Sequence, residues 1–156
     1  MRAVIQRVTR ASVAVNGGEP RPIGPGLVIL LGVRDTDDIA IVPKLAEKCA
    51  HLRIFEDEDG KLNRSAVELG YSALVVSNFT LYGDTSRGKR PSFIHAAKGE
   101  TAKSAYDSFL QELMNTQVIS VRTTDDQELV ADTVRKYDLL SIPVVDHENR
   151  MVGIIT

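Results

Sequence analysis

A short apolar run, Leu27–Val33, limits the folds that are open to this chain. It follows a stretch rich in proline and glycine, and it is far shorter than the roughly 20 residues that a membrane-spanning helix needs. Its length and the turn residues before it predict a fully buried β-strand. A second apolar strand is predicted over 73–80, so the sequence indicates a substantial sheet.

The rest of the pattern predicts a mixed α/β (α+β) domain. Residues 2–15 are rich in Val, Ile, Thr and Ala and predict a strand or a bulged strand pair, and 52–55 predicts a short strand. Residues 35–51 predict a helix that begins with capping aspartates and has Pro43 in its first turn. Apolar residues at helical spacing predict a second helix over 101–114.

Charge and cysteine content limit the class of protein. The 156 residues carry a net charge of −2, so no overall cationic field argues for nucleic acid, and any RNA contact must come from a local patch. The single cysteine, Cys49, excludes an internal disulfide and fits a reducing compartment, and we expect it to be a buried, unreactive thiol. No secretory signal pattern opens the chain, so a cytoplasmic location is expected.

A cluster with three polar side chains lies where the strand predicted over 73–80 ends. This cluster comprises Ser77, Asn78, Phe79 and Thr80. A glycine-punctuated loop follows, and its cations are Arg87, Lys89 and Arg90. Hydroxyl and amide groups beside a cationic loop suit an anionic substrate, such as RNA or a nucleotide, whose ester or carbonyl must be oriented.

Three roles of this cluster stay open on sequence pattern alone. Ser77 or Thr80 could be a nucleophile, but neither lies in a Gly-x-Ser-x-Gly motif, and the nearest histidine along the chain is His95. Thr80 could instead orient a substrate carbonyl, with backbone N–H groups as an oxyanion hole. The third role is structural, because such side chains often bond the loose backbone groups at a strand end.

No cofactor is expected. The three histidines are widely spaced, and no cysteine or carboxylate lies at metal-ligand spacing from them, so we expect no metal site. The segment Gly83–Lys89 has the glycine spacing of a phosphate-binding loop. Arg90 stands where such a loop needs Ser or Thr, and Pro91 blocks the helix that should follow.

Several blocks, in register from residue 1 to about 113, resemble the D-aminoacyl-tRNA deacylases. They are residues 1–13, 23–33, 52–57 with 60–63, and 75–81 with Asp84, Thr85, Gly88 and 90–93. The resemblance implies a twisted sheet or barrel with flanking helices and a metal-independent homodimer. It also implies hydrolysis of the ester that joins a D-amino acid, or glycine mischarged on the tRNA for alanine, to the terminal adenosine of tRNA.

The family's Ser-Gln-x-Thr-Leu motif is similar to residues 77–81, where Asn78 replaces the glutamine. The resemblance implies that Thr80 stands for the threonine once proposed as the nucleophile. It also implies that the ribose 2′-OH of the substrate assists hydrolysis while backbone groups near the cluster hold the ester. Arg7 matches the arginine that supports the chiral pocket. The family's late Gly-Pro dipeptide, which excludes L-amino acids, is missing, because no Gly-Pro follows residue 26.

Residues 114–156 instead resemble half of a cystathionine-β-synthase-type (CBS) repeat, of the kind found in some magnesium transporters. Strands are predicted at 118–121, 140–146 and 150–156, with a helix over 125–137. Such modules pair to form an adenosine-nucleotide cleft, so we do not expect this half alone to bind a nucleotide.

The sequence therefore predicts a deacylase domain over 1–113 and a CBS-like segment over 114–156 that replaces the usual C-terminal strands. The expected partners are aminoacyl-tRNA and a second copy of the chain, without a membrane. Loop cations Arg87, Lys89 and Arg90 are expected to face tRNA phosphates. The alternative interpretation is a chimeric scaffold with impaired catalysis, or a regulatory module that binds adenosine nucleotides.

Overall fold

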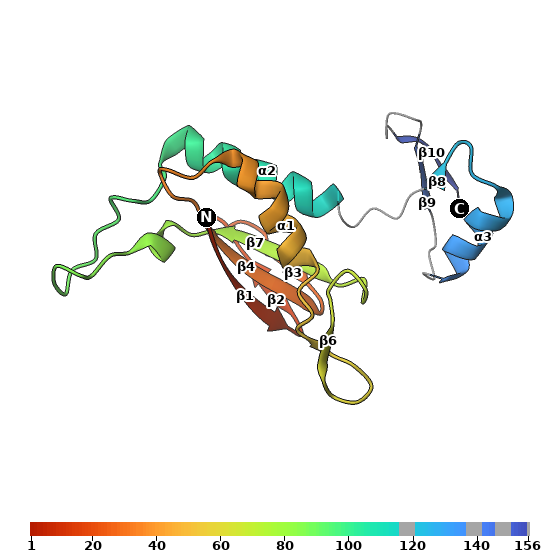
Figure 1. Ribbon diagram of the computed structural model, residues 1–156, viewed down its shortest axis with the longest axis horizontal. Coiled ribbons are helices and arrows are strands. Elements are labelled where there is room, and N and C mark those ends of the chain that lie inside the picture. Colours follow the sequence, from red (N-terminus) through yellow and green to blue (C-terminus); the bar gives the residue numbers. More distant parts are fainter. Residues whose placement is uncertain (116–120, 137–141, 146–150, 156) are drawn as a thin grey trace. The chain divides into compact units, whose positions relative to one another are not determined.

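The chain forms two compact units, Met1–Gln117 and Val118–Thr156. The computed structural model describes residues 1–115, 121–136, 142–145 and 151–155 (Figure 1). In the described part of the chain, no helix is both long and apolar enough to cross a membrane.

A three-stranded sheet in the order β1–β4–β7 forms the centre of the first unit. β1 (Arg2–Val8) is antiparallel to β4 (Gly26–Gly32), and β4 is parallel to β7 (Ser72–Ser77). The two apolar strands that the sequence predicts are thus real and adjacent. The predicted 73–80 strand ends early, because the chain turns into a 3₁₀ helix, η2 (Phe79–Tyr82), directly after Asn78.

Helices cover one face of this sheet. α1 (Val42–Ala50) and α2 (Gly99–Asn115) both lie on the same side of it (Figure 1). Alternate residues of a strand point to opposite faces. The side chains of β4 that point toward the helices are therefore buried in one core with Phe109 of α2, which is 0% exposed. Full burial of such a side chain contributes about 1.5–3 kcal/mol, so this contact is a main source of stability.

The first helical segment divides in two. Asp38 caps a 3₁₀ helix, η1 (Ile39–Ile41), by accepting a hydrogen bond from the N–H of Ala40 at 2.9 Å. α1 begins only at Val42, so Pro43 lies in its first turn as predicted, where its missing N–H costs nothing. The second helix is also confirmed, since α2 covers the whole predicted range of 101–114.

The region 2–15 forms two strands that do not pair with each other. β2 (Ala11–Val13) pairs with β3 (Arg21–Ile23), whereas β1 pairs with β4. The connection from β2 to β3 includes Asn16 and Gly17, both with positive φ. Asparagine and glycine tolerate that conformation better than other residues, which explains the turn signal at this point.

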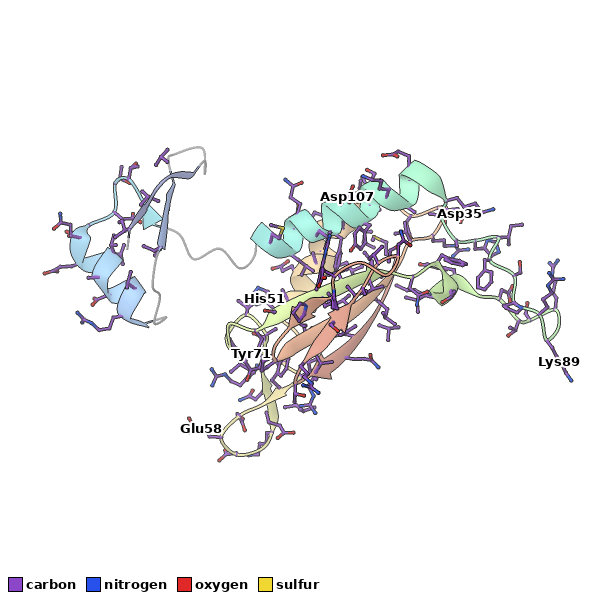
Figure 2. All side chains as sticks on the ribbon, turned by 180° about the vertical axis from the view of Figure 1, so that it is seen from behind. Asp35, His51, Glu58, Tyr71, Lys89 and Asp107 are labelled. Atoms are coloured by element: carbon purple, nitrogen blue, oxygen red, sulfur yellow. The ribbon has the colours of Figure 1, made fainter. Side chains whose placement is uncertain are left out.

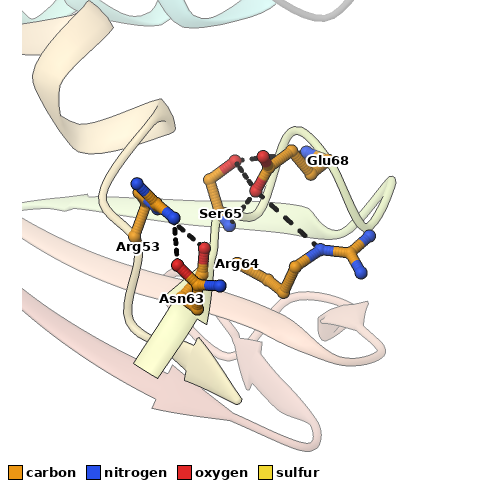
Figure 3. Close-up of polar contacts among 5 residues, drawn as sticks. All are labelled: Arg53, Asn63, Arg64, Ser65 and Glu68. Carbon is orange, nitrogen blue, oxygen red and sulfur yellow. Dashed lines mark hydrogen bonds and ion pairs between the residues drawn. The ribbon is translucent and has the colours of Figure 1, made fainter. Parts of the chain in front are cut away.

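The strand predicted at 52–55 is wrong. The observed strand is β5 (Phe55–Glu56), which pairs with β6 (Leu62–Arg64). Arg53 precedes it and donates from Nε to the carbonyl oxygen of Asn63 at 2.8 Å (Figure 3). The side chain of Arg53, rather than a backbone ladder, therefore ties this part of the chain to β6.

A capping box follows β6. The backbone N–H of Ser65 donates to a carboxylate oxygen of Glu68 at 2.6 Å, and the N–H of Glu68 donates to Oγ of Ser65 at 3.3 Å (Figure 3). The hydroxyl of Ser65 also donates to the carboxylate of Glu68, at 3.1 Å. The two hydrogen bonds that the carboxylate accepts lower the pKa of Glu68 below its ordinary value, the backbone donor first and the hydroxyl second. The pattern Ser-x-x-Glu is a known signature of such a turn.

A buried residue of α1 and a half-buried one of α2 join the helices to the sheet. Cys49 of α1 is 1% exposed, and burial raises the pKa of its thiol to about 11, so the prediction of a buried thiol is confirmed. Tyr106 of α2 donates its hydroxyl proton to the carbonyl oxygen of Val75 in β7 at 2.9 Å.

The second unit has the predicted order of strand, helix, strand and strand. β8 (Val121–Arg122), α3 (Gln127–Lys136), β9 (Ile142–Val145) and β10 (Met151–Ile155) follow one another. β8 is parallel to β9, and β10 is antiparallel to it. The predicted strand residues 118–120, 140–141, 146, 150 and 156, and the helix residue 137, lie outside the described residues.

The contact between β4 and β7 depends on Gly26. A Cβ atom at this position would lie 1.9 Å from the carbonyl oxygen of Ser72, which belongs to backbone and cannot swing away. We expect Gly26→Ala to reduce the free energy of unfolding by about 1–3 kcal/mol or more, as overpacking does. Chemical denaturation measures this change.

Gly24→Ala is the matched control, since nothing lies within 4 Å of a Cβ atom there. It should change stability by less than about 0.5 kcal/mol, as at most open surface positions. Equal stability of the two variants would contradict the close approach of β4 and β7.

Candidate functional site

The predicted cluster lies at the end of β7. The N–H of Asn78 donates to the carbonyl oxygen of Leu31 at 2.8 Å, so the ladder between β4 and β7 continues one residue beyond the strand. The chain then enters η2, and Oδ1 of Asn78 caps this helix by accepting the N–H of Thr80 at 3.0 Å. The same oxygen accepts the hydroxyl proton of Thr80.

The backbone under η2 leaves no room for larger residues. A Cβ atom on Gly32, the last residue of β4, would lie 3.0 Å from Cβ of Leu81 and 3.2 Å from the carbonyl oxygen of Asn78. Arg2 of β1 donates to the carbonyl oxygen of Leu81 at 2.7 Å, and its guanidinium lies 4.6 Å from the ring centroid of Tyr82. All three strands of the sheet therefore fix the position of η2.

The contacts of Thr80 limit its chemistry. Its hydroxyl donates to an amide oxygen, which is no general base. In the described ranges, no side chain of His, Asp or Glu is found in a hydrogen bond with Ser77 or Thr80. The geometry therefore gives no support to an activated nucleophile. The structural role of Asn78 as a cap is real, and the side chains of Ser77 and Thr80 stay exposed and accessible to a substrate.

A closed cationic loop follows η2. The backbones of Asp84 and Ser92 exchange two hydrogen bonds of 2.8 Å, and Oδ1 of Asp84 accepts the N–H of Ser86 at 2.8 Å. Within the described residues no ion pair is found for the loop cations Arg87, Lys89 and Arg90, all of which are exposed. Figure 2 shows Lys89 at the tip of this loop. The loop thus presents unneutralised positive charge next to the cluster.

Arg7 lies away from the cluster within one copy of the chain. It is in register with Leu27 and Ala73, four residues along β7 from Ser77, which corresponds to about 13 Å. Its guanidinium instead forms an ion pair with Glu56 at 3.6 Å. The structure therefore brings Ser77–Thr80 and the cationic loop together, but not Arg7.

A small cavity beside the cluster is lined by residues that the sequence analysis did not propose for the site. Its volume is about 220 Å³, and it is lined by Arg2, Arg34, Tyr82, Gly83, Asp84 and His95. Arg2 is opposite Gly32 in the register of β1 and β4. Knowledge of that pairing, which a single sequence does not contain, would have placed Arg2 near the cluster.

Asp84 gives the loop a pH dependence. Hydrogen bonds from the backbone N–H and the hydroxyl of Ser86 hold the pKa of Asp84 below its ordinary value of 3.8. Because the folded-state pKa is the lower one, the ionised carboxylate stabilises the loop above about pH 4, and this stabilisation is lost as the pH falls through the folded pKa. An NMR titration of the carboxyl carbon should give a midpoint below 3.8.

Ser86→Pro removes the backbone donor and should raise that midpoint toward the ordinary value. Ser86→Ala keeps the N–H and should raise it less. A midpoint of 3.8 or above in the unaltered chain would contradict these contacts.

Comparison with known proteins gives consistent matches. A family model described as "D-Tyr-tRNA(Tyr) deacylase" matches residues 4–136, and so extends through α3. The D-aminoacyl-tRNA deacylase of Symbiobacterium thermophilum is 49% identical over 136 residues, which are 85% of this chain and 90% of that protein. The enzyme of the same name from Thermomicrobium roseum is 54% identical over 113 residues, 72% of this chain and 73% of that protein.

Two solved structures share the fold. One, entitled "c-Myc DNA Unwinding Element Binding Protein", has a TM-score of 0.69 and 43% identity, and covers 75% of this chain and 78% of its own. The other is described as a probable eukaryotic D-amino acid tRNA deacylase, with a TM-score of 0.65 and 17% identity, covering 74% and 67%. The predicted mixed α/β fold and the predicted family are thereby confirmed. The chain belongs to the D-aminoacyl-tRNA deacylase family of hydrolases.

Proposed function

We propose that Ser77, Asn78, Phe79 and Thr80 form the site at which this deacylase holds and hydrolyses the ester of a D-aminoacyl-tRNA. The observation that carries the proposal is the arrangement around Asn78. Its amide oxygen accepts both the N–H and the hydroxyl of Thr80 at an exposed strand end. The site is thus ordered before the substrate arrives, which is the arrangement that lowers an activation barrier most.

Hydrolysis at this site requires orientation more than a protein nucleophile. Water adds to the ester carbonyl, the bond between the acyl carbon and the ribose oxygen breaks, and that oxygen leaves as a hydroxyl with the proton from water. Phe79 is the first residue of η2, so its N–H has no acceptor within that helix and can donate to the developing oxyanion. We propose that the neighbouring 2′-OH of the ribose assists this water, since the hydroxyl of Thr80 donates to an amide oxygen rather than to a base.

The cationic loop supplies the contact with the tRNA backbone. Arg87, Lys89 and Arg90 are exposed, and no ion pair within the described residues neutralises their charge. Phosphate contacts by such residues release counterions and make binding depend on salt. We expect each contact to contribute a slope of about −0.7 in a plot of log affinity against log salt for a single strand.

We propose a homodimer as the active form. The row Val4, Leu30 and Val76 lies on the sheet face opposite the helices, and Val4 is 44% exposed. Apolar residues on such a face favour burial against a second copy. Because Arg7 lies far from Ser77 in its own chain, a supporting role of Arg7 in the pocket requires that the partner copy supply it.

We further propose that a CBS-like appendage follows the deacylase domain. The sequence predicts the boundary between residues 113 and 114, whereas α2 continues to Asn115 and the compact units divide after Gln117. The parallel strands β8 and β9 with α3 between them, followed by the antiparallel β10, support this proposal. The appendage is half of a module that works in pairs, so we expect no binding of adenosine nucleotides by it. Action on tRNA fits a cytoplasmic location.

Hydrolysis of D-tyrosyl-tRNA and L-tyrosyl-tRNA by the full chain tests the proposal. We expect cleavage of the D ester. Thr80→Val keeps the size of the side chain but loses the hydrogen bond to Asn78, which should lower kcat/KM about tenfold. Thr80→Ser keeps the hydroxyl and should stay near the original rate.

Cys49→Ser is the control variant outside the site and should leave the rate unchanged, since the thiol is buried and protonated. Cleavage of both esters would assign the missing Gly-Pro dipeptide as the cause of lost chiral selection. A folded chain that cleaves neither ester would contradict the proposal and favour the impaired scaffold.

A further inference from the structure

We propose that Phe79 and Phe93 form an aromatic platform on which an unpaired base at the 3′ end of the substrate RNA stacks. The base belongs to the nucleotide beside the one that carries the ester. This inference rests on the proposed function, because it takes the position of the ester from the cluster at residues 77–80.

The first argument is the exposure of the aromatic pair. The two rings lie with centroids 5.0 Å apart at 75°, in an edge-to-face contact. Phe79 is nevertheless 56% exposed, and the adjacent Ile94 is 69% exposed. The chain has four phenylalanines, of which Phe55 and Phe109 are buried in the core. The other two therefore lie together outside the core, Phe79 exposed and Phe93 half-buried, beside the candidate site.

The second argument is that both rings are held by backbone. Phe79 begins η2, which Asn78 caps. A Cβ atom on Gly83 would lie 3.1 Å from the ring of Phe93, so this ring packs directly against the glycine backbone. Phe93 also follows Ser92, whose hydrogen bonds with Asp84 close the cationic loop. A surface fixed in this way loses little conformational entropy when a ligand binds.

The third argument is the charge beside the rings. The loop that ends at Phe93 carries Arg87, Lys89 and Arg90. Aromatic faces next to a cationic groove are the arrangement with which proteins bind single-stranded nucleic acids, since every base has a face that can stack. The buried centre of a protein–protein interface is instead depleted in lysine. The combination thus favours a nucleic acid strand over a protein partner.

A fluorescence titration tests the platform directly. The chain contains no tryptophan, so Phe79→Trp introduces a single tryptophan, which is followed apart from the four tyrosines and keeps an aromatic face. We expect saturable quenching by the unacylated RNA trinucleotide CCA, and weaker quenching by AMP alone, because AMP has no neighbouring phosphates for the loop. Adding Phe93→Leu should weaken the binding of CCA about fivefold or more, the range of one lost stacking contact. The DNA trinucleotide distinguishes an RNA site from a general single-strand site.

Kinetics with D-tyrosyl-tRNA provide the second measurement. Phe93→Leu keeps an apolar side chain without an aromatic face and should raise KM about fivefold or more, with little change in kcat. Phe93→Tyr keeps the face and should restore KM. Ile94→Ala removes a more exposed but non-aromatic neighbour and serves as the control, with KM unchanged. Circular dichroism and thermal unfolding check that each variant is folded.

The outcomes separate the platform from the proposed function. Unchanged CCA binding and unchanged KM in folded Phe93→Leu, with the D ester still cleaved, would overturn the platform alone. Quenching that depends on Phe93 in a chain that cleaves no ester would support the platform and overturn the proposed function. If Phe93→Leu lowers the fraction of dimer in sedimentation without changing CCA binding, the surface is a contact between copies and the platform is wrong.

Discussion

Parallel pairing between β4 and β7 is the interaction on which the rest of the first unit depends. The two strands approach so closely that Gly26 cannot carry a Cβ atom at one end. At the other end, a Cβ atom on Gly32 would lie 3.0 Å from Cβ of Leu81 in η2. Between these glycines, alternate side chains of β4 are buried under the helices. The last bond of the pairing, from Asn78 to Leu31, delivers the candidate site to the end of the sheet. Stability and function therefore share one set of hydrogen bonds.

Strong local signals explain what the sequence could predict. The apolar strands at 27–33 and 73–77, the helix over 101–114 and the role of Pro43 follow from hydrophobic period and proline geometry. The strand predicted at 52–55 is wrong because the side chain of Arg53, and not a backbone ladder, bonds to the carbonyl oxygen of Asn63. The end of β7 was misplaced because Thr80 is a good strand residue in isolation, and only the cap from Asn78 turns the chain into η2.

In the site as well, local patterns could be predicted from the sequence and strand register could not. The cluster and the loop cations are close in sequence, so their proximity in space could be predicted. Arg7 and Arg2 belong to β1, and their positions depend on a register that no local pattern contains. The register puts Arg2 beside η2 and Arg7 at the far end of the sheet. The amide oxygen of Asn78 caps the helix that follows it by accepting the N–H of Thr80, so this side chain serves local order.

The hydroxyl of Tyr106 affects how the outer edge of β7 can pair with another strand. The N–H groups of Ser72 and Asn78 donate toward β4. Successive residues of a strand bond to opposite sides, so the carbonyl of Val75 points to the outer edge of β7. Open edges of sheets recruit strands from other molecules and seed aggregation. Because Tyr106 occupies the middle acceptor of this edge, an incoming strand must first displace a tyrosine held by α2. One side chain thus covers the centre of this edge against pairing with another strand.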